Sequence, residues 1–138
     1  MKLLLLLAAD YANVTGDGKL NVMGIFNEIN ATHFPARHPS MHLVVKLGAE
    51  LGEYGETRGL TIKLVDVDGD QIMNLSGSAD VPQSVGGRKP EVNAILELKD
   101  IVFPKPGPYQ FIVLVDKDYK GDLTIYANEI EAQNIGKG

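Results

Sequence analysis

The most constraining feature of the sequence is an alternation of apolar and polar residues with a period of two, interrupted at short intervals by Gly, Pro, Asn or Asp. Successive side chains of a β-strand point to opposite faces, whereas one face of a helix recurs about every 3.6 residues. Leu60, Ile62 and Leu64 alternate with Thr61 and Lys63, which fits a strand and not a helix. The sequence therefore predicts an all-β protein.

The turn residues divide the chain into eight predicted strands. These are Lys2 to Ala9, Leu20 to Ile29, Met41 to Leu51, Leu60 to Asp66, Gln71 to Val81, Val92 to Val102, Tyr109 to Asp116 and Asp122 to Glu131. A length of 138 residues corresponds to a single domain, which we expect to span residues 1–138. Eight strands in such a domain indicate an antiparallel β-sandwich. Between two of them, Asp68-Gly69 predicts a type I′ hairpin turn with positive φ at both residues.

Two of the predicted strands are apolar on both faces. In the first strand leucines occupy both alternating sets, and in the Tyr109 strand Ile112 and Leu114 fall opposite the expected core residues. The side chains predicted to face outward are Leu4, Leu6, Ile112 and Leu114. Together they make an apolar patch larger than a monomer usually leaves uncovered. Either the segment Asn30 to Ser40 or a terminal tail covers this patch, or a second copy of the chain does.

The first strand also raises the question of an exposed sheet edge. Leu3 to Leu7 contains neither Pro nor an inward-pointing charge, which are the usual protections of an edge strand. If it lies at an edge, a strand of a neighbouring molecule can extend the sheet there. Strand addition is therefore a second predicted route to assembly.

Two irregular connections, Asn30 to Ser40 and Pro82 to Pro90, are predicted ligand-binding loops, because loops of sandwiches carry binding more often than the sheets do. The first contains His33 and His38 and is followed closely by His42, so zinc ligation is one reading. Pro35 and Pro39 stiffen this segment and no carboxylate adjoins the rings to orient them, so surface histidines are the simpler reading. In the second loop Arg88 and Lys89 follow two glycines and are candidate anion ligands, although the spacing of a phosphate-binding loop is absent.

Asp66, Asp68 and Asp70 crowd the same predicted turn. Calcium prefers carboxylate oxygens, so a peripheral calcium site is one interpretation. The Gly of this segment stands fourth rather than sixth, as an EF-hand loop requires, and the turn joins two strands. A hairpin turn explains the same residues without an ion.

The composition of the chain argues against several classes of function. The net charge of −5 and the scattered Lys and Arg argue against a nucleic-acid partner. The chain has no cysteine, and no residues show the spacing of a catalytic site, so we expect a non-catalytic protein without a cofactor. The apolar run from Leu3 to Ala9 is too short to span a membrane and has a single Lys before it. We therefore expect a strand there and a cytoplasmic protein.

Two segments of the sequence resemble segments of other proteins. The opening run of leucines with Ala9-Asp10, followed by Gly18-Lys19-Leu20 and Gly24, resembles the start of an uncharacterised bacterial family that is described only as a domain of unknown function. The segment Pro106 to Asp116 is similar to an edge found in many β-sandwich domains. The resemblance implies a small β-sandwich and supplies no activity, ligand or site residue.

The sequence thus favours a protein that acts by self-association or as a scaffold, with itself or another protein as partner. A sandwich that binds a sugar or a divalent cation through residues 30–40 and 82–90 is the alternative. An enzyme is the third possibility, because sequence spacing assembles no nucleophile, base and orienting group.

Overall fold

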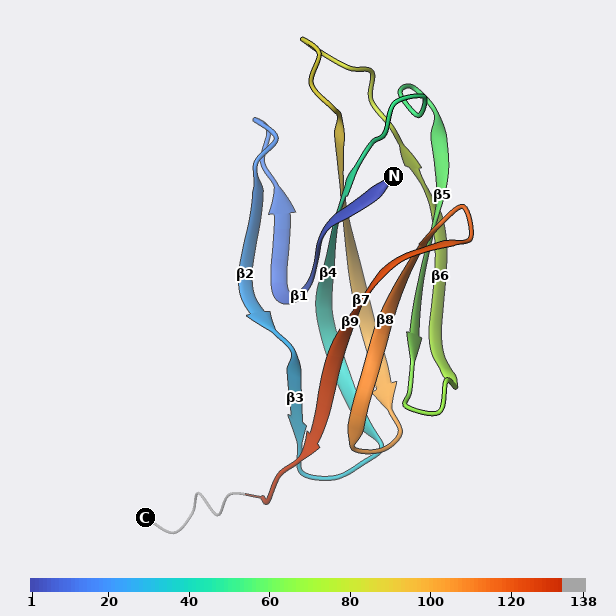
Figure 1. Ribbon diagram of the computed structural model, residues 1–138. Helices are drawn as coiled ribbons and strands as arrows, with labels where there is room; N and C mark the ends of the chain where they lie inside the picture. The colour runs from blue at the N-terminus through green and yellow to red at the C-terminus, as the bar shows by residue number, and fades with distance from the viewer. Residues whose placement is uncertain (133–138) are drawn as a thin grey trace.

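A computed structural model describes residues 1–132, which form nine strands and no helix (Figure 1). The strands are β1 (Lys2–Val14), β2 (Leu20–Phe26), β3 (Glu28–Ala31), β4 (Ala36–Gly48), β5 (Thr57–Val65), β6 (Gln71–Asp80), β7 (Glu91–Phe103), β8 (Gly107–Val115) and β9 (Asp118–Glu129). They form a four-stranded sheet of order β2-β1-β4-β7 and a five-stranded sheet of order β3-β9-β8-β5-β6. The predicted all-β sandwich is confirmed.

The structure has one strand more than the sequence predicts, because Leu20 to Ile29 is divided. β2 forms an edge of the four-stranded sheet, and after Asn27 the chain crosses to the other layer as β3. β3 runs parallel to β9, whereas every other pair of neighbouring strands in residues 1–132 is antiparallel. Figure 1 shows β2 and β3 following one another down the same side of the molecule.

The core lies between the two sheets. β4 contributes Met41, Leu43, Val45 and Leu47, all fully buried, and β5 and β8 contribute the alternating residues that the sequence assigns to the inside. β1 lies beside β9 and β6 beside β7, so both long sides of the sandwich are approached by a strand of the opposite sheet. At the first of these sides the Leu3 side chain occupies the space in which Gly121 has no Cβ.

Tyr109 anchors the corner between β7 and β8. Its ring is 1% exposed and packs edge-on against Phe103, with ring centroids 4.9 Å apart. Its hydroxyl donates a hydrogen bond to the Lys105 carbonyl at 2.6 Å and accepts one from the Lys105 N–H at 3.2 Å. The corner Pro104 to Pro108 is thus fixed by a side chain from the core, in the manner of the tyrosine corner of immunoglobulin-like sandwiches.

β1 is longer than predicted and changes partners along its length. Lys2 to Ala9 pairs with β4, whereas Ala8 to Val14 pairs with β2. In Figure 1 the first half of β1 descends and the second half ascends, so that the second half and β2 stand as a hairpin at the left of the view. Beyond Ala9 the hairpin is a two-stranded ribbon.

The turn at Asp68-Gly69 differs from the predicted type I′ turn. Gly69 has φ +84°, but Asp68 does not take a positive φ. The Gly69 N–H donates to the Asp66 carbonyl at 3.0 Å, and the Asp66 N–H donates to the Asp70 carbonyl at 2.9 Å. This is the three-residue connection in which a type I turn is followed by a left-handed glycine. The prediction failed because Asp-Gly occurs in both turns.

A two-residue turn with positive φ occurs instead between β8 and β9. Asp116 and Lys117 have φ +49° and +72°, which matches a type I′ hairpin. The Asp116 carboxylate accepts hydrogen bonds from the Gly59 N–H at 2.8 Å and from the Arg58 guanidinium at 3.1 Å. No such contact relieves Lys117, so this lysine carries the strain of a left-handed conformation.

Replacement of Lys117 by Gly is therefore expected to stabilise the protein. A non-glycine residue in the left-handed region costs about 1–2 kcal/mol, of which the greater freedom of unfolded glycine takes back a part. We expect the free energy of unfolding in urea to rise by about 0.5–1 kcal/mol. Lys120→Gly, inside β9, is the control and should lower it, because glycine weakens a strand. An equal loss from both substitutions would contradict this account of the turn.

Candidate interaction surface

One face of the four-stranded sheet is apolar although it points away from the core. In β4, Leu43 and Val45 belong to the core, so Val44 between them points outward, yet Val44 is 0% exposed. The register places Leu7 of β1 and Ile95 of β7 on either side of it, both half-buried. Three apolar side chains from three neighbouring strands thus form a row on the outer face.

The apolar surface continues onto the hairpin of β1 and β2. Ala9 pairs with Ile25 and Tyr11 pairs with Met23, and all four lie on the same outer face as Leu7. Met23 is 66% exposed, Ile25 64% and Tyr11 49%. We call the following residues the outer apolar surface: Leu5, Leu7, Tyr11, Met23, Ile25, Val44 and Ile95.

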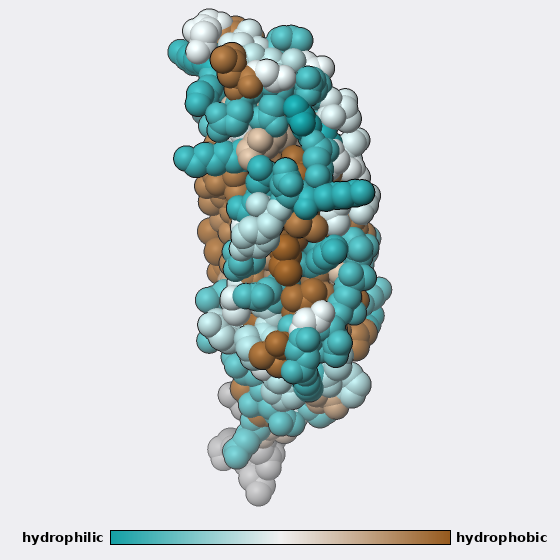
Figure 2. Space-filling view, turned by 45° about the vertical axis from the view of Figure 1, so that its right-hand side comes forward, coloured by the Kyte–Doolittle hydropathy of each residue, from teal (hydrophilic) through white to brown (hydrophobic). Residues whose placement is uncertain are grey.

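Side-chain contacts attach the β1 hairpin to β4 at the border of this surface. The Tyr11 ring meets the His42 ring edge-on, with centroids 5.2 Å apart. Nδ1 of His42 lies 3.2 Å from the Asp10 carbonyl oxygen. The β1 hairpin is thereby tied to β4 at the point where their backbone pairing ends, at Ala9. Across the molecule, Figure 2 shows apolar side chains reaching the surface in patches with hydrophilic side chains between them.

The four residues predicted as a single patch are not together. β1 and β8 belong to different sheets, so Leu4 is separated from Ile112 and Leu114 by the core. A register shift in β1 before Leu5 also reverses the expected alternation, and Leu6 packs against the core. Leu4, 44% exposed, remains on the outside, at the end of the four-stranded sheet. The predicted contiguous patch is wrong, because a bulge and the strand order cannot be read from alternation.

Ile112 and Leu114 lie on the outer face of the five-stranded sheet and are half-buried. In the register, Ile112 stands between Lys63 and Asp122, and Leu114 stands beside Thr61. The stems of long polar side chains can cover such aliphatic groups within one molecule. A partner is therefore not needed to explain these two residues.

The pairing of β1 bears on two further expectations. β1 lies between β2 and β4 in strand order, but Leu3 to Leu7 pairs with β4 alone, because β2 begins to pair at Ala8, so within residues 1–132 this half of β1 has one side without a paired strand. The segment Asn30 to Ser40 does not fold over β1, because its larger part is strand: β3 ends at Ala31 and β4 begins at Ala36. Within residues 1–132, β2 is the outermost strand of the four-stranded sheet on this side.

The three histidines do not form a site. His33 is exposed between β3 and β4. His38 is half-buried with its ring centroid 5.7 Å from that of Phe26, and burial lowers the pKa of His38. His42 lies on the outer face against Tyr11. In residues 1–132 a grouping suited to a metal occurs at aspartates, not at these histidines.

Arg88 and Lys89 are exposed in the loop between β6 and β7, as predicted. Together with Pro82 and Val85 they line a hollow of about 450 Å³. Nζ of Lys89 lies 3.5 Å from the Glu50 carboxylate, so one of the two cations already has a counter-ion. Both side chains are exposed to solvent, and their contacts do not select a ligand.

Asp66, Asp68 and Asp70 each offer a carboxylate oxygen, and these oxygens lie within 4.8 Å of one another. One oxygen of Asp66 accepts the N–H groups of both Asp68 and Asp70 at 2.9 Å. Nζ of Lys105 lies 3.3 Å from Asp68, and this hydrogen bond raises the pKa of Lys105. The hairpin turn thus uses the Asp66 carboxylate, and the ion pair with Lys105 uses the Asp68 carboxylate.

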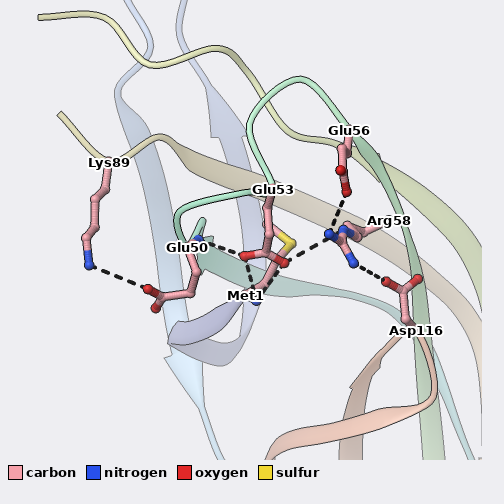
Figure 3. Close-up of polar contacts among 7 residues, drawn as sticks. All are labelled: Met1, Glu50, Glu53, Glu56, Arg58, Lys89 and Asp116. Atoms are coloured by element: carbon pink, nitrogen blue, oxygen red, sulfur yellow. Dashed lines mark hydrogen bonds and ion pairs between the residues drawn. The ribbon is translucent and has the colours of Figure 1, made fainter. Parts of the chain in front are cut away.

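A polar cluster that the sequence does not predict lies at the end of the sandwich (Figure 3). The Met1 side chain is 0% exposed, and the α-ammonium of Met1 lies 2.8 and 2.9 Å from the two carboxylate oxygens of Glu53. Glu53 also accepts the Glu50 N–H at 2.7 Å and lies 3.7 Å from the Arg58 guanidinium, which in turn meets Asp116 at 3.1 Å. These contacts join the start of β1 to β5 and to the turn after β8.

The charges of this cluster shift the pKa values of its carboxyl groups. Burial alone would raise the pKa of the Glu53 carboxyl, but the hydrogen bonds from Met1 and Glu50 and the nearby positive charges hold that pKa below its ordinary value. The Gly59 N–H and the Arg58 guanidinium lower the pKa of Asp116. Both carboxylates are therefore ionised at neutral pH and serve the fold.

Sequence reasoning missed Tyr11, Met23 and Ile25. The predicted first strand ends at Ala9, which leaves Tyr11 in a loop, and Leu20 to Ile29 was expected to alternate without interruption. The signal that could have found them is the turn sequence Thr15 to Gly18 between two runs with period two. It indicates a hairpin, and hairpin pairing sets Met23 opposite Tyr11.

No helix in residues 1–132 has the length and hydropathy needed to cross a membrane. A search of curated protein sequences finds no match to the chain. A solved structure that resembles it is the Pseudomonas fluorescens alkylpurine DNA glycosylase AlkC, bound to DNA containing an abasic site analog. The TM-score is 0.44 at 12% identity, over 88% of this chain and 30% of the glycosylase chain, which is too low to inform the function.

The comparison with family models agrees with the resemblance seen in the first strand. The model of a family of unknown function, DUF6941, matches residues 4–128, which include all but the ends of the sandwich. The chain therefore belongs to the DUF6941 family.

Proposed function

We propose that this protein acts without catalysis, by associating with further copies of itself through the outer apolar surface. The observation that carries the proposal is that Met23, Ile25 and Tyr11 are half to two-thirds exposed and continuous with the row around Val44. Monomeric proteins seldom leave large apolar side chains grouped in this way, whereas scattered ones are common. The surface fits a protein partner better than a small ligand, because it is a sheet face.

The expected strength of this contact is moderate. Full burial of one large apolar side chain contributes about 1.5–3 kcal/mol, and the exposed parts of Met23, Ile25 and Tyr11 offer roughly half of that each. A symmetric dimer uses every residue twice, which doubles the gain. Association costs about 4–15 kcal/mol in lost freedom, so we expect a reversible dimer whose population depends on concentration.

Two features support further parts of the proposal. Leu3 and Leu6 pack in the core, so the leucine run is part of the folded domain, which supports the cytoplasmic location that the sequence suggests. The net charge of −5 supports a protein partner rather than a nucleic acid.

Sedimentation velocity over a range of concentrations tests the proposal. We expect the wild-type protein to shift from monomer to dimer and Ile25→Glu to raise the dissociation constant at least about tenfold, because it buries a charge in the contact. Leu51→Glu is the matched control, since Leu51 is 87% exposed outside the surface. A wild-type protein that stays monomeric at high concentration, or an equal effect of both substitutions, would refute the proposal.

A further inference from the structure

We infer that the outer face of the five-stranded sheet carries a binding site for a neutral saccharide, at the end where β8 begins and β9 ends. This site goes beyond the proposed self-association, because that contact uses the outer face of the other sheet. A hollow in the five-stranded sheet has the size, the side chains and the charge that such a ligand requires.

The hollow has a volume of about 420 Å³, within the range of about 300–1,000 Å³ that is typical of small-molecule sites. It is formed by β8, by β9 and by the turn after β5, which meet at the lower end of the molecule in Figure 1. The lining residues are Asp66, Val67, Pro108, Gln110, Thr124 and Tyr126.

Four of these side chains are placed by strand pairing. Pro108 stands opposite Tyr126 in the register, and Gln110 stands opposite Thr124. Tyr109, between Pro108 and Gln110, belongs to the core, so its two neighbours point outward. Two adjacent cross-strand pairs on one sheet face thus present a ring, an amide and a hydroxyl side by side.

The lining combines an aromatic ring with hydrogen-bonding groups of both kinds. Tyr126 is 45% exposed and offers a flat apolar surface against which the C–H groups of a pyranose ring can stack. The Gln110 amide and the Thr124 hydroxyl both donate and accept hydrogen bonds, and the Asp66 carboxylate accepts them. Gln110 is exposed and Thr124 half-buried, so a ligand can reach their polar atoms. A saccharide matches this lining, because its hydroxyls donate and accept around a ring with apolar C–H groups.

The charge of the lining argues against ionic ligands. Among the described residues that line the hollow, Asp66 alone is charged, so a phosphate or carboxylate would meet a negative charge without a counter-ion. A cationic amine would be attracted by Asp66, but sites for such ligands surround the cation with several aromatic rings. Tyr126 is the single aromatic residue of this lining, and an amine would leave the acceptor and donor groups of Gln110 unused. A neutral ligand rich in hydroxyls fits all of these groups.

The walls of the hollow are held in place without a ligand. One oxygen of Asp66 accepts the N–H groups of Asp68 and Asp70 at 2.9 Å, which orients this carboxylate. Nζ of Lys105 lies 3.3 Å from the Asp68 carboxylate and ties the turn to the corner before β8. That corner is fixed in turn by the Tyr109 hydroxyl. A site whose groups are already placed loses little freedom on binding, which favours affinity.

We expect weak binding at a single site. An open hollow contacts one or two sugar rings, which corresponds to a dissociation constant of about 1 mM. Self-association through the outer apolar surface would leave the hollow of each copy open, because the hollow lies in the other layer. A dimer would therefore bind a polymeric glycan more tightly than a monomer does.

A titration of the isotope-labelled protein, followed by its amide signals in NMR spectra, tests the site. The probes are the methyl glycosides of glucose, galactose, mannose and N-acetylglucosamine and the disaccharides maltose, cellobiose and lactose. We expect at least one of them to shift the signals of Gln110, Thr124 and Tyr126 in a saturable way. Tyr126→Ala should weaken this binding about tenfold, because the stacking surface is lost, whereas Tyr126→Phe keeps the ring and should bind nearly as well as wild type.

Tyr119→Ala is the matched control, because Tyr119 is 59% exposed on the same strand and lies outside the hollow. It should leave saccharide binding unchanged, and thermal melting checks that each variant is folded. The inference is overturned if no probe gives saturable shifts, if the shifts lie at other residues, or if Tyr126→Ala and Tyr119→Ala act equally. Loss of binding on addition of EDTA would also overturn it, since these contacts use no ion. Sedimentation of Tyr126→Ala should match wild type, so a failure here leaves the proposed function standing.

Discussion

Tyr109→Ala is expected to remove most of the stability of the fold. The substitution deletes a ring that is 1% exposed and packed on Phe103, and large-to-small changes of aromatic core residues cost about 3–5 kcal/mol. It also leaves the N–H and carbonyl of Lys105 without the hydroxyl that satisfies both. Since domains are stable by only about 5–15 kcal/mol, we expect a loss of about 5 kcal/mol and a large fall in the urea midpoint.

Two further variants separate the contribution of the Tyr109 hydroxyl from that of its ring. Tyr109→Phe keeps the ring and removes only the hydroxyl, so we expect a loss of about 1–3 kcal/mol. Tyr126→Ala is the control, because Tyr126 is 45% exposed, and it should cost less than about 1 kcal/mol. If Tyr109→Phe proved harmless, the corner would depend on packing alone and the role assigned to the hydroxyl would be wrong.

Glu53→Ala is expected to give the second largest effect. It leaves the partly buried Met1 ammonium without its counter-ion, and it removes the acceptor of the Glu50 N–H. Breaking a buried pair costs about 3–5 kcal/mol, and the 12% exposure of the Glu53 side chain places this case near the lower limit. Urea unfolding at neutral pH should show a loss of about 3 kcal/mol.

The effect of Glu53→Ala should depend on pH in a defined direction. The folded-state pKa of Glu53 lies below its ordinary value of 4.5, so the carboxylate contributes its full stabilisation above that pH. As the pH falls through the lowered folded-state pKa, this contribution is lost. The difference between wild type and Glu53→Ala should therefore shrink in acid and stay constant near neutrality.

Glu50→Ala serves as the control for Glu53→Ala, because Glu50 is exposed and its carboxylate lies 3.5 Å from an exposed Lys89. Such surface pairs contribute little to stability. A pH-independent difference between wild type and Glu53→Ala would mean that packing, and not the ion pair, explains the loss.

The sequence predicted the strands well where alternation is regular. Leu60, Ile62 and Leu64 face the core as expected, because β5 has a partner on each side and a single buried face. Prediction failed at Leu6, where a bulge shifts the register, and at Leu20 to Ile29, where the chain changes sheets. Neither event leaves a mark on apolar periodicity, because both depend on long-range pairing.

The candidate surface was only partly accessible to sequence reasoning. An apolar outer face was correctly suspected for the first strand, but it was assigned to Leu4 and Leu6, whereas after the bulge Leu5 and Leu7 occupy it and Leu6 packs against the core. The extent of this face could not be predicted, because Met23 and Ile25 join it through the hairpin register with β1. Which strand is the edge follows from strand order, and strand order is set by contacts between residues far apart in the chain.

The crossing at Asn27 also has a mechanical consequence. β2 closes one layer and β3 the other, and the Asn27 carbonyl between them accepts the Tyr126 N–H at 2.8 Å. Both layers therefore share one border made of a single continuous stretch of backbone. Local unfolding that starts at either end of this stretch therefore weakens the strand pairing at the border of both sheets. A molecule bound along β2 and β3 would stabilise both sheets at once.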